Sequence, residues 1–344
     1  MRHLLNTLFV TTEGAYLAKD GQCVAVRVEN QTRLRLPIHT VGQIVCYGRV
    51  SCSPPLMGFC GEKGVGLCFM SSSGRFLASV QGPVRGNVLL RRQQYRWADD
   101  DGGSAAIAAA VVAGKVANAR TVLLRARRDH IDQPDGHPLH LAAERMADAL
   151  RCLQQPGPTT DVVRGIEGDA ARAYFGVFDH LVTSQKQDFF MRERSRRPPL
   201  DNLNALLSFL YALLVREATW ALETVGLDPC VGFLHRDRPG RPSLALDLME
   251  ELRPVIADRL ALSLVNRRQV AGDGFRRTES GGVLMDDATR KTVLVAWQKR
   301  KQEEITHPFI NEKMPVGLLP VVQAQLLARH LRGDLDGYPP FIWK

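Results

Sequence analysis

Three stretches of the sequence place ionisable side chains among small or apolar neighbours, where a substrate or an ion could be held. The first surrounds Glu167, whose neighbours Gly168, Ala170 and Ala171 are small enough to allow close approach to its carboxylate. Because short motifs of this kind often carry no function, a tightly packed helix crossing with an exposed glutamate is the better interpretation of this stretch alone.

The second stretch joins a histidine to carboxylates on a predicted helix. His235 leads through a basic loop to Ser243, which can cap a helix over residues 244–252. On that helix Asp247 and Glu250 are three residues apart, so they project from neighbouring positions on one face. A lone histidine is usually an ordinary core or surface residue, but a histidine followed by two carboxylates on one helical face is less common.

These residue types suggest a divalent metal ion. Mg²⁺ prefers oxygen ligands and keeps several waters, whereas an imidazole shifts the preference toward Mn²⁺ or a later metal. Two carboxylates and one histidine would leave positions open for a phosphodiester and for a nucleophile, whose pKa the ion would lower. Two alternatives stay open. Glu251 lies four residues from Asp247 and offers a competing geometry, and Arg253 could simply form salt bridges with these acids.

The third stretch is a basic run that ends at a Pro-Pro pair. Its arginines are Arg192, Arg194, Arg196 and Arg197. A helix that Asp201 can cap follows the run, with a polar stripe formed by Asn204, Ser208 and Tyr211. Arginines beside a candidate metal site suit a DNA phosphate backbone, and the stripe could line the same cavity. Taken alone, the run is better interpreted as a solvated basic loop.

Charge and cysteine content narrow the class of protein. The 344 residues exceed what one hydrophobic core usually serves, and 45% hydrophobic with 24% charged residues is ordinary globular composition. The net charge of +9 favours a polyanionic partner such as nucleic acid, and residues 1–95 carry 11 basic and 4 acidic side chains. Seven cysteines without a CxxC pair indicate neither a disulfide framework nor a zinc finger, which favours a reduced, cytoplasmic chain.

The pattern of predicted elements changes near residue 85. Up to about residue 80, β-rich runs alternate with Gly, Pro and Ser, and Asp20-Gly21 between two of them is a strong hairpin signal. Beyond Gly86, helical periodicity fits the runs 88–97, 105–124, 139–153, 162–182, 203–225, 244–252, 256–265 and 318–331. We therefore predict an α+β protein in which a small, basic N-terminal β domain over residues 1–85 precedes a larger, all-α-helical catalytic domain over residues 86–344.

Neither a signal peptide nor a membrane segment is expected. The first residues lead into a short mixed run rather than a long apolar one. The longest apolar runs, at 105–114 and 205–215, are each about half a membrane span and are flanked by charge. We expect both to be core helices.

At this point the sequence resembles a known family. In order along the chain, its principal motifs read GIEGDAARAYF, RRPPLDNLNALLSFLYALL and GFLHRDRPGRPSLALDLMEELRP, with weaker matches in GKVANAR, ADRLALSLVNR and GYPPFIWK. Together they resemble the CRISPR-associated adaptation integrase family, Cas1, over essentially the whole chain. Their form is similar to that of subtype I-C systems.

The resemblance implies a β domain followed by a helical domain, and a metal-dependent DNA endonuclease and integrase. Such an enzyme inserts foreign DNA fragments as spacers into a CRISPR array, when a fragment's 3′-hydroxyl attacks a phosphodiester at the repeat border. By motif, the metal-binding and catalytic triad falls on Glu167, His235 and Glu250, with Asp247 as the adjacent acidic position and Mg²⁺ or Mn²⁺ as the ion. His235 could instead act in acid–base catalysis, since an imidazole can do either.

Partners are also expected. Joining both ends of one fragment needs two active sites at a fixed distance, so we expect a homodimer, with the edge strands of the β domain as its surface. The resemblance further implies a Cas2 protein that bridges two dimers and, in this subtype, a Cas4 nuclease that trims the fragment. Three other functions stay open: a general metal-dependent nuclease on branched DNA or RNA, a non-catalytic DNA-binding scaffold, and a zinc hydrolase.

Overall fold

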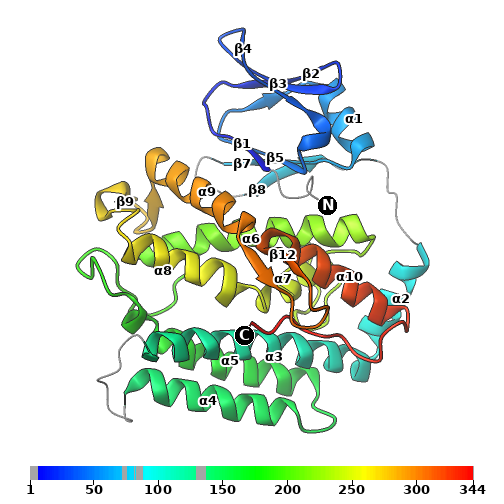
Figure 1. Cartoon of the computed structure of the whole chain (residues 1–344), viewed down its shortest axis with the longest axis vertical. Helices are drawn as coiled ribbons and strands as arrows, with labels where there is room; N and C mark the ends of the chain where they lie inside the picture. The colour runs from blue at the N-terminus through cyan, green and yellow to red at the C-terminus, as the bar shows by residue number, and fades with distance from the viewer. Residues whose placement is uncertain (1–6, 72–75, 81, 83–87, 129–136, 344) are drawn as a thin grey trace. The chain divides into compact units, whose positions relative to one another are not determined.

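The computed structural model of the chain describes residues 7–71, 76–80, 82, 88–128 and 137–343 (Figure 1). Its internal contacts divide it into two compact units. The first consists of Met1–Arg85 together with Arg290–Glu303, and the second of Gly86–Thr289 together with Glu304–Lys344. The prediction kept residues 86–344 in one domain, so it did not foresee that the chain returns to the first unit.

Two four-stranded sheets form most of the first unit. The first sheet has the order β1 (Thr7–Val10), β5 (Gln43–Tyr47), β7 (Gly66–Met70) and β8 (Phe76–Val80), and only its β7–β8 pair is antiparallel. The second sheet has the order β4 (Gln31–Pro37), β3 (Cys23–Val28), β2 (Tyr16–Asp20) and β6 (Ser51–Cys52). Buried side chains of both sheets, among them Leu17, Val24, Ile44 and Leu67, belong to one hydrophobic core.

The hairpin predicted near Asp20-Gly21 joins β2 to β3. Asp20 pairs with Cys23, so the loop consists of Gly21 and Gln22, one residue later than predicted. Gly21 has a φ of +60°, which glycine adopts without steric cost because it lacks a Cβ atom.

Two helices pack with these sheets. Helix α1 (Pro54–Lys63) was not predicted, although Ser53 caps it by accepting a hydrogen bond from the Leu56 N–H and Gly64 ends it in the left-handed region. Helix α9 (Asp287–Gln302) joins the first unit through Lys301, whose Nζ donates to Thr7 Oγ1 over 3.1 Å. A short 3₁₀ helix, η2, spans Ile38–Thr40.

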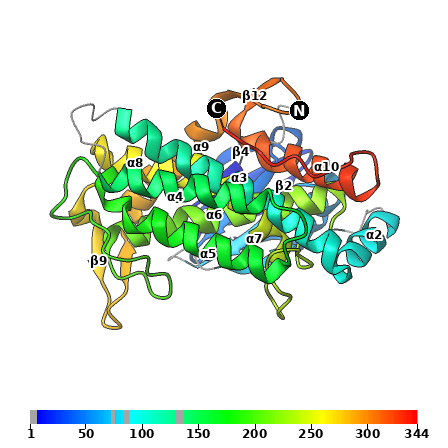
Figure 2. The same cartoon turned by 90° about the horizontal axis from the view of Figure 1, so that it is seen from below.

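Helices dominate the second unit, and Figure 2 shows α3, α4 and α5 running side by side. The helices are α2 (Val88–Asp99), α3 (Asp101–Arg128), α4 (Pro138–Leu153), α5 (Thr160–Gly176), α6 (Asn202–Val225), α7 (Ser243–Glu250), α8 (Arg259–Asn266) and α10 (Leu319–Leu331). Between α7 and α8 lies a π-helix, η4 (Arg253–Asp258), and the short 3₁₀ helices are η3 (Phe178–Leu181), η5 (Gly272–Gly274) and η6 (Val316–Leu318). The mixed α+β class, with strands first and helices later, is confirmed.

The second unit is not exclusively helical. One hairpin pairs β9 (Phe275–Arg277) with β10 (Val283–Met285), and another pairs β11 (Glu304–Thr306) with β12 (Lys313–Pro315). Each strand has only three residues, which is too short for an alternating pattern to be recognised in the sequence. This corrects the prediction that residues 86–344 are all helical.

Helices α3 and α6 form the centre of the second unit. Both are long and apolar enough to cross a membrane by length and composition alone, but 56% and 67% of their most apolar windows are buried inside the protein. They pack on α4, α5, α7 and α10. Both are therefore core helices of the second unit, as predicted.

Candidate active site

Helices from distant parts of the sequence bring the predicted residues together. Glu167 lies on α5 and Glu250 is the last residue of α7, while His235 lies in the loop that precedes α7. Two basic residues complete the group: Lys115 on α3 and Arg253 at the start of η4. The structure therefore brings the three members of the predicted triad into one place.

The Lys115 ammonium lies between the two glutamates. Its Nζ contacts Glu167 Oε1 and lies 2.7 Å from Glu250 Oε2. The other oxygen of Glu250, Oε1, forms an ion pair with Arg253 NH1 at 2.6 Å and is 3.9 Å from His235 Nε2. Lys115 thus bridges the two carboxylates at one oxygen of Glu250, while Arg253 and the imidazole of His235 lie near the other.

Both oxygens of the Asp247 carboxylate accept hydrogen bonds from the loop that carries His235. Its Oδ2 accepts the backbone N–H groups of Phe233 and Leu234 over 2.6 and 2.9 Å, and its Oδ1 accepts the N–H of His235 over 3.0 Å. His235 Nδ1 lies 2.6 Å from the same Oδ1. A carboxylate with this many donors holds the histidine ring rather than an ion, and it directs Nε2 toward Glu250.

A glycine allows this close approach. A Cβ atom on Gly232 would lie 2.8 Å from Asp247 Oδ2 and 2.8 Å from the backbone carbon of Ser243, which is too close for any larger residue. Ser243 was predicted to cap α7, but it is the first residue of the helix and its hydroxyl donates to the Arg236 carbonyl over 3.2 Å. The other predicted cap is confirmed, because Asp201 accepts from the Asn204 N–H at the start of α6.

The charges around Glu250 keep it ionised. Burial of this carboxyl group would raise its pKa, but the nearby charges of Arg253 and Lys115 outweigh burial and lower the pKa to about 2. Only 2% of Glu250 is exposed, so its charge is stable only because these cations surround it. A buried carboxylate held ionised among cations is suited to bind a further cation in their place.

The donor set can be compared with the needs of a metal ion. Among the residues that the structure describes, no three His, Cys, Asp or Glu side chains are close enough to hold a metal ion as they stand. The Lys115 ammonium explains this, because it separates the two carboxylates. Two hard carboxylate oxygens and one imidazole fit Mg²⁺ or Mn²⁺ chemically, provided that the ammonium moves away.

The predicted basic run divides into exposed and buried members. Arg192, Arg196 and Arg197 are exposed, whereas Arg194 is half-buried and turned inward. The Arg194 guanidinium donates to Asn204 Oδ1 over 2.6 Å and reaches Ser208 Oγ at 3.4 Å. Burial lowers the pKa of Arg194. Only three of the four arginines are thus presented to a partner at the surface of the second unit.

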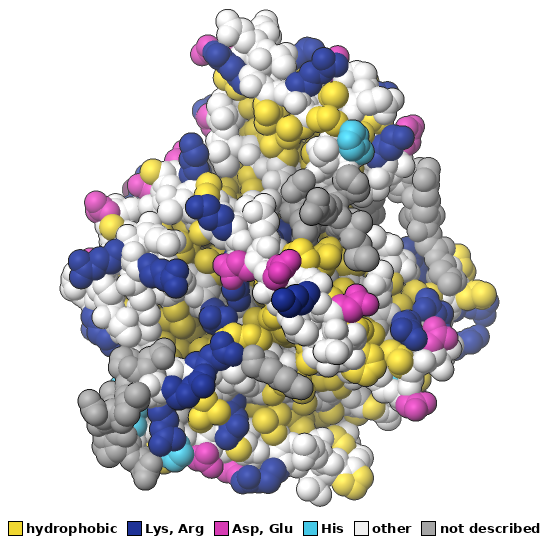
Figure 3. All heavy atoms as spheres, viewed as in Figure 1, with side chains coloured by type: hydrophobic (Ala, Val, Ile, Leu, Met, Phe, Trp, Pro, Cys, Tyr) yellow, Lys and Arg dark blue, Asp and Glu magenta, His cyan; other side chains and the backbone are white. Residues whose placement is uncertain are grey.

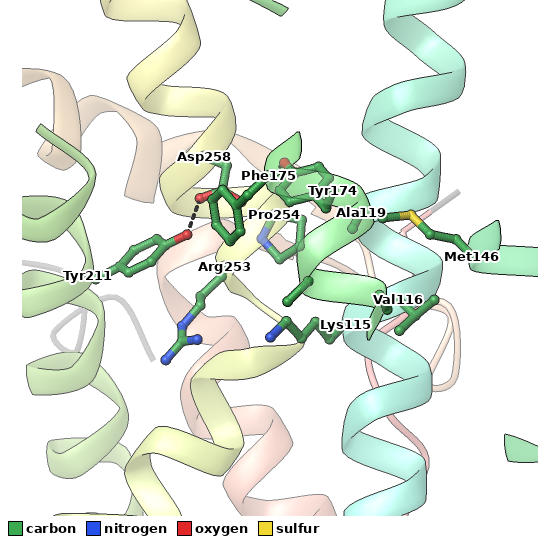
Figure 4. A pocket seen from close by; sticks show the side chains of 12 residues that line it. Lys115, Val116, Ala119, Met146, Tyr174, Phe175, Tyr211, Arg253, Pro254 and Asp258 are labelled. Atoms are coloured by element: carbon green, nitrogen blue, oxygen red, sulfur yellow. Dashed lines mark hydrogen bonds between the residues drawn. The ribbon is translucent and has the colours of Figure 1, made fainter. Parts of the chain in front are cut away.

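A small cavity of about 20 Å³ lies beside the site (Figure 4). Figure 4 shows Lys115 and Arg253 reaching toward the same side of it, and Tyr211 bonded to Asp258. The Tyr211 hydroxyl donates to Asp258 Oδ1 over 2.6 Å, and the Tyr174 hydroxyl donates to Oδ2 over 3.2 Å. Of the predicted polar stripe, therefore, Tyr211 lines a cavity near the site, while the other two members hold Arg194.

A second, larger cavity adjoins His235. Its volume is about 790 Å³, and it is formed by the junction of α2 and α3, the segment that leads into α5, and the loop before α7. Asp161 and Arg236 form an ion pair on its wall at 2.9 Å. This cavity gives the His235 side of the site access to solvent.

Sequence reasoning assigned no role to Lys115. It belongs to the motif GKVANAR, but nothing in that motif indicates that α3 crosses α5 and α7 at this residue. The available signal was that Lys115 is the only charged residue between Ser104 and Ala119, in an otherwise mostly apolar helix. A single cation in such a helix usually needs a buried partner.

Comparisons with known proteins identify the family of the chain. The family model described as CRISPR associated protein Cas1 matches residues 8–299. The chain is 53% identical over 344 residues to CRISPR-associated endonuclease Cas1 1 of Chlorobaculum tepidum and 54% identical over 347 residues to CRISPR-associated endonuclease Cas1 2 of Rhodospirillum rubrum, each time over the full length of both proteins. A solved Cas1 protein from Thermotoga maritima shares the fold, with a TM-score of 0.79 at 22% identity over 95% of this chain and 97% of that one.

These matches define a CRISPR-associated endonuclease. The chain belongs to the Cas1 family, as the sequence motifs predicted. Endonucleases of this family are generally metal-dependent nucleases.

Proposed function

We propose that Glu167, His235 and Glu250 together hold the divalent ion, Mg²⁺ or Mn²⁺, with which this enzyme acts on DNA. The observation that carries the proposal is the position of the Lys115 ammonium, which contacts Glu167 and lies 2.7 Å from Glu250 Oε2. A cation already fits between the two carboxylates, and His235 Nε2, 3.9 Å from the other oxygen of Glu250, supplies a third donor nearby. Asp247 is the positioning residue of this set, not a ligand.

The protein groups have distinct roles in this proposal. When bound, the ion would stabilise charge on a phosphodiester and lower the pKa of an attacking hydroxyl. Asp247 holds the proton on His235 Nδ1, so that the lone pair of Nε2 faces the ligands. Arg253 offsets the charge of Glu250, and Lys115, once displaced, pairs with a phosphate oxygen of the DNA.

The reaction is a transesterification. The 3′-hydroxyl oxygen of a DNA fragment attacks the phosphorus of a phosphodiester at the border of the repeat. A new P–O bond to the fragment forms while the bond to the leaving 3′-oxygen breaks, and the proton lost by the attacking hydroxyl is balanced by the one that the leaving oxygen gains. One phosphodiester replaces another, so no nucleotide hydrolysis is needed.

Basic side chains hold the DNA in this proposal. Arg192, Arg196 and Arg197 are exposed near the start of α6 and are suited to phosphate oxygens. Lys and Arg side chains also occur at many separate places on the face drawn in Figure 3, which suits a long polyanion rather than a small ligand. The cavity of about 790 Å³ beside His235 offers space for a strand end.

The proposed partners are DNA, a second copy of this chain, Cas2 and Cas4. Two similar solved structures are a Cas6-RT-Cas1–Cas2 complex and a casposase bound to integration product, with TM-scores of 0.80 and 0.83. Relatives that are 34% and 35% identical are fusions of a Cas4 exonuclease with a Cas1 endonuclease. Strand β4 is an exposed edge of its sheet and supplies a surface for the dimer. The motif form further supports subtype I-C.

A strand-joining assay tests the site. The purified chain, with Mn²⁺ or Mg²⁺, should join a labelled DNA fragment bearing a 3′-hydroxyl to a duplex that contains a repeat. Glu167→Gln should abolish joining, whereas Asp169→Asn, at an exposed position two residues further along α5, should leave the rate within about twofold. Full joining by Glu167→Gln would refute the assignment. Loss of activity in both variants would point instead to a disturbed helix.

The same assay ranks the two acids on α7. Asp247→Ala should reduce joining about 10- to 100-fold, as expected for a group that orients a ligand. Glu250→Ala should have the larger effect. The reverse order would move the ligand from Glu250 to Asp247.

A further inference from the structure

The segment Tyr338–Trp343, which we call the strap, has three buried side chains in the second unit although it forms no helix or strand. Phe341 is completely buried, and Tyr338 and Trp343 are 5% and 9% exposed. The strap lies within the motif GYPPFIWK, to which the proposed reaction gives no role. A buried irregular segment must find partners for its backbone groups, so those partners show what the strap is fastened to.

One partner is Asn118 on α3. Its Nδ2 donates to the Phe341 carbonyl over 2.8 Å and to the Glu251 carbonyl over 2.7 Å, and its Oδ1 accepts from the Trp343 N–H over 2.7 Å. Asn118 is completely buried, and these bonds use both ends of its amide. One side chain on α3 therefore joins the strap to the end of α7.

The other partner is Glu251, the residue after Glu250. Its carboxylate accepts from the Phe341 N–H over 2.7 Å and from Gln323 Nε2 over 3.0 Å, and it also accepts from the Tyr338 hydroxyl. All three donors are neutral, and two of them belong to the strap. The carboxylate is thus used to fasten the strap and not to meet a cation.

The strap also touches α3 next to Lys115. A Cβ atom on Gly114 would lie 2.9 Å from Pro340 Cβ and 3.0 Å from Glu251 Cβ, so glycine is needed for this contact. At the end of the strap, the ring of Trp343 contacts two guanidinium groups. Arg125 lies 3.5 Å and Arg259 lies 4.2 Å from the centre of the ring.

We propose that the strap, through Asn118 and Glu251, positions Glu250 and Lys115 for the reaction of this enzyme. The inference rests on the proposed function, because it assigns a support to that site. The strap is attached to the residues that directly precede Lys115 and directly follow Glu250. Without it, Glu251 would keep its bonds to Asn118 on α3 and Gln323 on α10 but would lose the Phe341 N–H and the Tyr338 hydroxyl, two of the three donors to its carboxylate. The strap acts through these neighbours and touches no reacting atom.

The test uses the full chain with two strap variants and one matched control. Phe341→Ala removes the central buried side chain, and Glu251→Gln removes acceptor capacity without creating a cavity. Phe309→Ala is the control, since Phe309 is 51% exposed and lies outside the strap. Each protein is assayed for strand joining, for Mn²⁺ binding by electron paramagnetic resonance, and for hydrogen exchange of residues 243–251 without metal.

Positioning predicts a specific combination of results. Both strap variants should lose about 10- to 100-fold in kcat while KM for DNA changes less than about twofold, and they should bind Mn²⁺ about 10-fold more weakly. Hydrogen exchange at the end of α7 should accelerate in both. Phe309→Ala should match the wild type in all three measurements.

Three results separate the strap from the site itself. Folded strap variants with wild-type kcat, wild-type Mn²⁺ affinity and unchanged exchange would refute the proposal, even if their melting temperatures fell. If Phe341→Ala fails to fold, Glu251→Gln decides alone. The strap variants could show accelerated exchange at the end of α7 while replacement of Glu250 leaves Mn²⁺ binding unchanged. That combination would support the role of the strap in holding α7 and would refute Glu250 as a metal ligand.

Discussion

Glu250 and Glu251 are neighbours in sequence and both are buried, but they face opposite environments. Glu250 faces Arg253 and Lys115, whose charges overcome the effect of burial and lower its pKa to about 2. Glu251 faces only neutral hydrogen-bond donors, and burial raises its pKa to about 7 although those donors lower it. Because the two residues share one helix end, the difference comes from what each side of α7 packs against.

This comparison separates two uses of a buried carboxylate. One surrounded by cations stays charged and can exchange one cation for another, which is what a metal site requires. One surrounded by hydroxyl, amide and backbone N–H groups fixes a chain segment in place. Burial alone does not distinguish them, since Glu250 is 2% exposed and Glu251 is completely buried.

The largest expected effect contrasts the two glutamates directly. Glu250→Gln should reduce kcat for strand joining by at least about 1,000-fold, or about 4 kcal/mol, because a ligand and its charge are lost. Glu251→Gln should cost about 10-fold, because it only loosens the support of Glu250. Single-turnover joining at saturating DNA measures both. Equal losses of kcat in the two variants would contradict different roles for the glutamates on the two sides of α7.

The cation between the glutamates gives the next effect. Lys115→Met leaves Glu167 and Glu250 without their shared ammonium, so the metal-free protein should melt about 5 °C lower. Mn²⁺ should raise the melting temperature of this variant by more than it raises that of the wild type, since no ammonium has to be displaced. Thermal melting with and without Mn²⁺ checks both. Lys299→Met, at an exposed position on α9, is the control, and a smaller Mn²⁺ effect in Lys115→Met would contradict the competition.

A third buried carboxylate, Asp258, extends the comparison to pH. Burial raises its pKa to about 6, although Tyr211 and Tyr174 donate to it and lower it. The folded pKa lies above the unfolded value of about 3.8, so its contribution to stability is complete below pH 3.8 and is lost as the pH rises through 6.

Asp258→Asn cannot ionise at this position. Its stability relative to that of the wild type should therefore increase when the pH is raised from 4.5 to 7.5. The expected gain in the free energy of unfolding is about 1 to 3 kcal/mol. Urea unfolding at both pH values measures it, with the exposed Asp273→Asn as control. A difference between variant and wild type that does not change with pH would mean that Asp258 stays ionised in the folded protein.

The smallest effect concerns the basic run. Replacing Arg192, Arg196 and Arg197 together by alanine should reduce the slope of log affinity against log salt by up to about 0.9 per lost phosphate contact on duplex DNA. Arg194→Ala should leave this slope unchanged and lower stability instead, because its guanidinium is held by Asn204 and Ser208. Titrations of duplex DNA at several salt concentrations decide this. If Arg194→Ala alone reduced the slope, Arg194 and not its three exposed neighbours would be the phosphate contact.

Local signals in the sequence predicted most of the helices, though not α1 or α9, and part of the site. The spacing of Asp247 and Glu250 placed both on one buried face of α7, and Asp201 caps α6 as expected. The spacing alone did not distinguish the two acids, and only the resemblance favoured Glu250, because the backbone N–H groups of residues 233–235 that converge on Asp247 cannot be read from the local pattern.

The features that the sequence did not reveal all depend on distant contacts. Lys115 lies 52 residues from its partner Glu167, and Asn118 lies 223 residues from Phe341. No periodicity or cap marks such a pair. Arg194 had the same local pattern as its exposed neighbours, and only the packing of α6 turned it inward. Helix α1 had both of its end signals, Ser53 and Gly64, but lay among strong strand patterns.

Mn²⁺ binding to the wild type and to Glu250→Gln, followed by electron paramagnetic resonance of the free ion, tests the central claim most directly. The account predicts one ion per wild-type chain, with the site lost or weakened at least about 100-fold in Glu250→Gln while the fold and DNA binding persist. An ion bound with equal affinity by both proteins would contradict it, because Glu250 would then not be a ligand.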